Sequence, residues 1–97
     1  MKNKDEIMSI IKGLKADIKK RYKVKELGLF GSVLRGEMTE ASDVDILVDF
    51  EEDADLFDLT GLGLFLEEKL GQRVDIVPKR SLRQEIKDAV LREAVSI

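Results

Sequence analysis

Two aspartates, Asp43 and Asp45, lie two residues apart in an otherwise apolar segment of this 97-residue chain. Successive side chains of a β-strand point to opposite faces, so these two project from the same face, roughly 6.6–7 Å apart along the backbone. Two like charges on one face repel each other unless a counter-charge is supplied. A divalent cation, or a pair of cations about 3.5–4 Å apart, would supply it.

A third aspartate, Asp75, lies within a short apolar run over residues 74–77. A charged group in such a run is costly unless it is paired or binds a metal. If the strand that carries Asp75 lies beside the strand that carries Asp43, three carboxylates converge, and hard oxygen ligands suit Mg²⁺ with bound phosphates. The alternative interpretation is a plain surface ion pair between Asp75 and Arg73 or Lys79.

A glycine–serine pair, Gly31 and Ser32, follows a predicted strand over residues 24–30. Glycine lets the backbone approach an anion closely, and a serine hydroxyl with the first N–H groups of a helix can hold a phosphate. Residues 33–36 are long enough for one helical turn, and Arg35 can reach phosphate oxygens with its forked guanidinium. Taken alone, a Gly-Ser pair is far more often an ordinary turn.

The composition removes several other kinds of site. The chain has no Cys and no His, which excludes disulfides, thiolate and imidazole metal sites, and a histidine general base. Any metal must therefore be held by oxygen. The net charge of −3 argues against a dedicated nucleic-acid surface or a basic membrane anchor. No apolar run approaches the roughly 20 residues of a membrane span and no signal peptide is evident, so we expect a cytoplasmic protein.

Hydrophobic periodicity predicts the elements that must position these groups. The predicted class is α/β or α+β, with a small mixed sheet flanked by helices in a single domain over residues 1–97. Apolar residues at helical spacing and alternating apolar residues predict helices over residues 3–22 and 56–70, strands over 24–30, 43–50 and 73–77, and a last helix with its N-cap at Ser81.

The apolar residues of these elements predict which faces are buried. The central strand has one wholly apolar face, the second helix has an apolar stripe, and so does the last helix. These residues are Val44, Ile46, Val48 and Phe50; Leu59, Leu62, Phe65, Leu66 and Leu70; and Leu82, Ile86, Val90 and Leu91. Gly61 and Gly63 weaken the prediction for the middle of the second helix, and Gly71 is a candidate C-terminal cap.

Residues 29–50 resemble the signature of the minimal nucleotidyltransferases of the DNA polymerase beta superfamily. The family pattern is Gly-Ser, ten residues, then Asp-x-Asp, and the Gly31–Ser32 pair stands at that distance from Asp43 and Asp45. The later Gly-x-x-Val-Asp-Ile-Val element of the family matches residues 71–77, which contain Asp75. The resemblance covers nearly the whole chain, and the combined motif is specific.

The resemblance implies a fold like the polymerase beta palm and transfer of a nucleotidyl group from an NTP to a hydroxyl. It implies that Asp43 and Asp45 bind two Mg²⁺ ions, and that Asp75 holds the metal at the acceptor and takes its proton. It further implies that Gly31 and Ser32 bind the phosphates of the leaving pyrophosphate, with Arg35 as a weaker candidate for a phosphate contact.

The chain also resembles the antitoxins of two-gene systems in which a minimal nucleotidyltransferase is paired with a HEPN-domain toxin. That resemblance implies a type VII-like antitoxin that transfers AMP from ATP to a tyrosine hydroxyl of the toxin. Two alternatives stay open: an antitoxin that neutralises its partner by binding alone, and a transferase that acts on a small-molecule hydroxyl. A homodimer is also compatible with the sequence.

Overall fold

The computed structural model describes residues 2–37, 39 and 41–97, and it contains a four-stranded mixed sheet in the order β3-β2-β1-β4. The elements along the chain are α1 (Lys4–Tyr22), β1 (Val24–Phe30), β2 (Val44–Phe50), α2 (Leu56–Leu70), β3 (Val74–Pro78), a short 3₁₀ helix (Lys79–Ser81), α3 (Gln84–Glu93) and β4 (Val95–Ser96).

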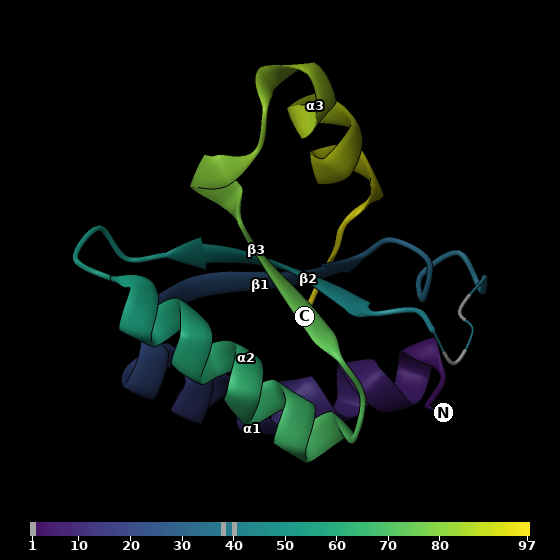
Figure 1. The fold of residues 1–97 in the computed structure, drawn as a ribbon, viewed down its shortest axis with the longest axis horizontal. Helices are drawn as coiled ribbons and strands as arrows, with labels where there is room; N and C mark the ends of the chain where they lie inside the picture. Colours follow the sequence, from purple (N-terminus) through teal and green to yellow (C-terminus); the bar gives the residue numbers. More distant parts are fainter. Residues whose placement is uncertain (1, 38, 40) are drawn as a thin grey trace.

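The two long helices cover one face of the sheet, and α3 lies over the other (Figure 1). Strand β1 runs antiparallel to β2 and to β4, whereas β3 runs parallel to β2. A parallel pair needs a crossover connection, and α2 supplies it between β2 and β3. This connection places the strand that carries Asp75 beside the strand that carries Asp45.

Both long helices begin and end at residues suited to those positions. Asn3 and Glu6 form a capping box at the start of α1, and Asp55 and Asp58 form another at the start of α2. Helix α2 ends at Leu70 and is capped by Gly71, whose φ of 67° lies in the left-handed region that glycine adopts without strain. The predicted helices over 3–22 and 56–70 and the predicted cap at Gly71 are confirmed.

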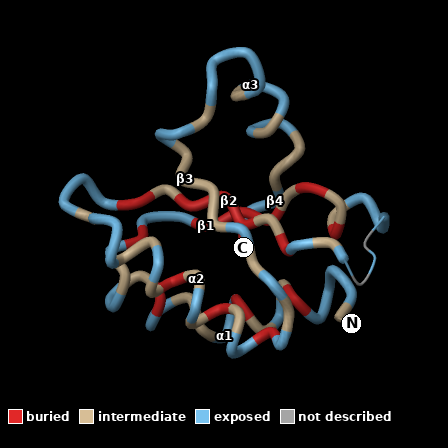
Figure 2. The backbone as a smooth tube through the Cα atoms, viewed as in Figure 1, coloured by how far each residue is buried: buried red, intermediate tan, exposed pale blue. Residues whose placement is uncertain are grey.

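The hydrophobic core lies between the sheet and the pair α1 and α2 (Figure 2). Strand β2 alternates as predicted, with all four residues of its apolar face buried. Helix α2 buries Leu62, Leu66 and Leu70, while Leu59 and Phe65 pack partly buried against them. No helix among the described residues has the length and apolar character needed to cross a membrane.

The C-terminal third differs from the prediction. Ser81 is not an N-cap: it ends the 3₁₀ helix, and α3 begins at Gln84 after Arg83, which makes no side-chain capping bond. None of the residues of the predicted apolar stripe on α3 is buried. The two-residue strand β4 carries no recognisable pattern, because its pairing with β1 is decided by the fold.

Candidate active site

The structure places Asp45 and Asp75 side by side on neighbouring strands. In the parallel pair β2 and β3 these two residues are direct register partners. Because Val44 and Ile46 point into the core beneath the helices, the intervening Asp45 points to the opposite face of the sheet. The sequence left open whether these two strands are neighbours, and the structure shows that they are.

Asp45 is the most strongly perturbed carboxyl of the site. Its side chain is half-buried, and this burial raises its pKa above the ordinary value, with further contributions from the charges of Asp75 and Asp43. Arg35 acts in the opposite direction but does not reverse the shift. Negative charge is therefore crowded at this point of the sheet, which is the condition that a bound cation relieves.

The Gly31–Ser32 turn packs directly against Asp45. Gly31 follows β1 with a φ of 82°, and its neighbour Phe30 is the register partner of Asp45 across the antiparallel pair. A Cβ atom added to Gly31 would overlap the Asp45 carboxylate. Glycine is thus required here for two reasons, its backbone conformation and the close approach of a charged side chain.

The segment after Gly31 is a hydrogen-bonded turn, not the short helix that we predicted. The amides of Leu34 and Arg35 both donate to the carbonyl of Gly31, and the Glu37 amide donates to the carbonyl of Ser32 at 2.9 Å. The chain leaves this geometry after one turn, since Gly36 has a φ of 72°. The amides of residues 34–37 are thus used within the turn, whereas the Gly31 amide donates to a side chain outside it.

Asp43 is exposed and forms an ion pair with Arg73, the Nε to Oδ1 distance being 3.1 Å. Arg73 also donates from Nη2 to the carbonyl of Ala41 at 2.7 Å. Arg73 is therefore the partner of Asp43, and the alternative pairing of Arg73 with Asp75 is wrong.

The three aspartates, as the structure places them, do not converge on a single metal position. Within residues 2–37, 39 and 41–97, no three acidic side chains stand close enough together to hold one ion. The donor set nevertheless fits Mg²⁺, because every candidate ligand is a carboxylate oxygen and Asp45 is crowded by the charges of the other two. An ion bound between Asp43 and Asp45 would share the Asp43 carboxylate with Arg73, which contacts its Oδ1 atom.

Arg35 and Glu93 add contacts that the sequence analysis did not foresee. Arg35 donates from Nη1 to Glu93 Oε1 and from Nε to Glu37 Oε1, each at 2.6 Å. The Gly31 amide donates to the same Glu93 oxygen at 3.0 Å. Glu93 lies 62 residues from Gly31 along the chain, so no local pattern could have connected them.

A cavity of about 260 Å³ lies between the open face of the sheet and the C-terminal end of α3. Its lining combines apolar with charged and polar residues: Glu26, Leu27, Gly28, Leu47, Asp49, Lys79, Leu91, Ala94 and Ser96. Leu47 and Asp49 continue the face of β2 that carries Asp45, so the cavity adjoins the aspartates.

Fold and site together define a nucleotidyltransferase. Residues 11–97 match the family model of the nucleotidyltransferase domain, and the chain belongs to that family. The predicted resemblance and the α+β class with a small mixed sheet are therefore confirmed, and the protein is an enzyme of the nucleotidyltransferase class.

Particular relatives narrow the class. A protein of Thermococcus cleftensis named protein adenylyltransferase MntA is 50% identical over 93 residues, covering 96% of this chain and 94% of that protein. A solved toxin–antitoxin structure with AMP-PNP has a TM-score of 0.72 at 29% identity, covering 93% of this chain and 70% of that one. A structure of a tri-AMPylated Shewanella oneidensis HEPN toxin in complex with an MNT antitoxin matches with a TM-score of 0.63 at 27% identity. The match covers 93% of this chain and 66% of that chain.

Proposed function

We propose that this protein transfers AMP from ATP to a tyrosine hydroxyl of a HEPN-domain toxin and thereby acts as its antitoxin. The observation that carries the proposal is the packing of the Gly31 turn against Asp45, with Asp75 in register beside it. This arrangement supports the proposal because nucleotidyl transfer needs phosphate-binding groups beside metal-binding carboxylates, and the turn and the aspartate pair are candidates for these two parts. The reaction is expected in the cytoplasm, where ATP is available.

Each predicted residue has a role in this proposal. Asp43 and Asp45 would hold Mg²⁺, and Asp75 would hold the ion nearest the acceptor. When bound, Mg²⁺ would neutralise phosphate charge and lower the pKa of the acceptor hydroxyl. The amides and hydroxyl of Gly31 and Ser32 would bind the β- and γ-phosphates.

The proposed transfer balances without any further reactant. The acceptor oxygen bonds to the α-phosphorus of ATP, the bond between that phosphorus and the bridging oxygen breaks, and pyrophosphate leaves. The proton of the hydroxyl passes to a carboxylate, for which Asp75 is the candidate because it is exposed on the open face. With no histidine in the chain, a carboxylate is the available base near the site.

The acceptor and partner are proposed from the relatives. The Thermococcus protein is named for protein adenylylation, and the Shewanella complex contains an AMPylated HEPN toxin. The AMP-PNP in the other toxin–antitoxin structure favours ATP as the nucleotide. We therefore expect a hetero-oligomer with a HEPN toxin. A homodimer would be detected as a separate species when the mass of the complex is measured.

The test is transfer of label from α-³²P-ATP, with Mg²⁺, into a purified HEPN-domain protein from the same organism and into a host lysate. We expect one labelled protein band with the wild type and none with Asp43→Asn. Parallel reactions with γ-³²P-ATP should label nothing, because that phosphate leaves in pyrophosphate.

The control variant is Asp49→Asn, which removes a carboxylate from the same face of β2 outside the proposed site. It should label the partner like the wild type. Label from γ-³²P-ATP in the partner would indicate phosphorylation and contradict the proposal. A toxin that is neutralised by the wild type and by Asp43→Asn alike, with no label, would indicate neutralisation by binding alone.

A further inference from the structure

We propose that the Glu93 carboxylate occupies, in the nucleotide-free protein, the position that a nucleotide phosphate takes on the Gly31–Ser32 turn. Nucleotide binding would then displace Glu93 and release the C-terminal end of α3 from the sheet. The inference rests on the proposed function, which places the phosphates of ATP at this turn.

The contacts of Glu93 are those of a bound anion. Its Oε1 atom accepts from the backbone amide of Gly31 at 3.0 Å and from Arg35 Nη1 at 2.6 Å. A backbone amide beside a glycine turn and an arginine fork are the donors that proteins use for phosphate oxygens. One oxygen of Glu93 therefore engages two of the three residues that are candidates for binding phosphate, Gly31 and Arg35.

The position of Glu93 in its helix supports the same interpretation. It is the last residue of α3, where the helix dipole disfavours negative charge. The rest of the helix follows the dipole rule, with Glu85 in the first turn and Arg92 in the last. The carboxylate at this end is accounted for by its partners on the turn and not by the stability of α3.

Helix α3 has little else to hold it against the sheet. None of its residues is buried, and Ile86 and Leu91 are 49% and 37% exposed. The chain after it is fixed separately, since β4 pairs with β1 and the buried Ile97 donates its amide to the carbonyl of Leu27. Loss of the Glu93 contacts would thus loosen α3 while leaving the C-terminus in place.

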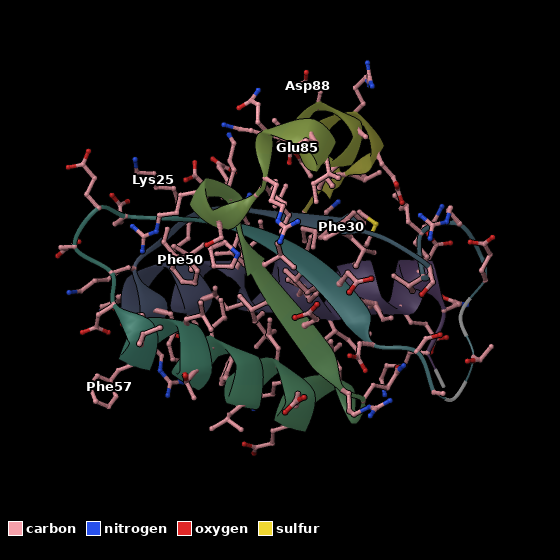
Figure 3. All side chains as sticks on the ribbon, turned by 45° about the horizontal axis from the view of Figure 1, so that its top comes forward. Lys25, Phe30, Phe50, Phe57, Glu85 and Asp88 are labelled. Carbon is pink, nitrogen blue, oxygen red and sulfur yellow. The ribbon has the colours of Figure 1, made fainter. Side chains whose placement is uncertain are left out.

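The experiment compares Glu93→Gln with Asp88→Asn, an equal change of charge on the outer side of the same helix (Figure 3). Calorimetry would measure binding of AMP-PNP with Mg²⁺, and of inorganic pyrophosphate with Mg²⁺. Removing the competing charge should tighten binding of both by about two- to fivefold, because a partly exposed ion pair has that order of effect. Asp88→Asn should bind within about twofold of the wild type.

Hydrogen exchange over residues 84–93 supplies the second readout. In the wild type, AMP-PNP should speed exchange in α3, whereas in Glu93→Gln exchange should already be fast without nucleotide and change little on binding. A purely structural role for Glu93 would speed exchange but would not tighten nucleotide binding. Glu93→Ala should behave like Glu93→Gln and provides a second variant if the first is unstable.

Equal or weaker nucleotide binding by Glu93→Gln would overturn this inference and leave the proposed function intact. Protection of α3 by AMP-PNP in the wild type would overturn it in the same way. Absence of nucleotide and pyrophosphate binding in every variant, together with absence of label transfer by the wild type, would overturn the proposed function and this inference with it.

Discussion

The two faces of the sheet contrast in what covers them. Helices α1 and α2 cover one face and bury aliphatic side chains such as Ile46 and Leu66 completely. The other face carries Asp45, Asp75 and a cavity, and its cover, α3, buries no residue of its own. The first face supplies the free energy of folding, so the second can hold crowded charge and a loosely attached helix. The predictions that follow compare these two faces, beginning with the largest expected effect.

The largest effect should come from Asp45→Asn on the open face. Loss of this carboxylate should lower the rate of AMP transfer by at least about 10³-fold, or roughly 4 kcal/mol, because a metal ligand beside the phosphates is lost. The circular dichroism spectrum should be unchanged, since the core lies on the other face. Normal transfer by this variant, with normal Mg²⁺ dependence, would contradict the two-metal assignment.

Leu66→Ala, on the helix-covered face, should lower the stability of the fold. The fully buried side chain leaves a cavity, and the free energy of unfolding should fall by about 2–5 kcal/mol in urea denaturation. Leu64→Ala, on the same helix but 63% exposed, is the matched control and should change it by less than about 0.5 kcal/mol. Similar losses in the two variants would show that α2 is not anchored as described.

Gly31→Ala should affect both faces, because this glycine joins the core strand β1 to the site. The positive φ and the overlap with the Asp45 carboxylate should lower the free energy of unfolding by about 1–3 kcal/mol. Nucleotide affinity, measured by calorimetry, should fall as well. Gly13→Ala is the control, since nothing lies within 4 Å of the added Cβ atom and its helical position favours alanine.

A smaller effect on stability should be its dependence on pH. Burial and the neighbouring aspartates raise the pKa of Asp45 in the folded protein above its pKa in the unfolded chain. Ionisation of Asp45 therefore lowers the stability of the fold as the pH rises from the unfolded-state pKa through the folded-state pKa. Without nucleotide or metal, Asp45→Asn should therefore raise the melting temperature at pH 7 by roughly a few degrees. The difference should shrink as the pH falls below about 4, the ordinary pKa of an aspartate, because only there is the carboxyl protonated in both states. A lower melting temperature for Asp45→Asn than for the wild type at pH 7 would contradict this, because it would show that the surroundings stabilise the ionised carboxylate.

Asp75→Asn tests whether Asp75 and its register partner Asp45 have different roles in the reaction. We expect turnover to fall more than nucleotide affinity, because Asp75 is assigned to the acceptor side of the reaction. The measurement is kcat and KM for ATP in the labelling assay. Equal loss in both parameters would indicate that Asp75 only supports the structure.

The glycines of α2 show where a local pattern is insufficient. Gly61 and Gly63 lower the helix propensity of this segment, yet α2 is continuous over Leu56–Leu70. A Cβ atom on Gly61 would lie 2.9 Å from Tyr22 Cε1, so the glycine allows the Tyr22 ring of α1 to approach α2. Glycine is needed at position 61 because two helices are in contact there, and the residue pattern of one helix alone cannot predict such a contact.

The sequence by itself determined the elements whose signals are local. Alternation along residues 44–50 and helical spacing over 56–70 depend on near neighbours, and each identified its element correctly. The Gly-Ser to Asp-x-Asp distance identified the family, which the family model over residues 11–97 confirms. The tertiary structure alone decided that Asp45 and Asp75 are register partners, that Arg73 pairs with Asp43, and that Glu93 lies on the Gly31 turn. These contacts join residues that are distant along the chain. They arise only when the strands and the last helix pack together, and no periodicity in the sequence records them.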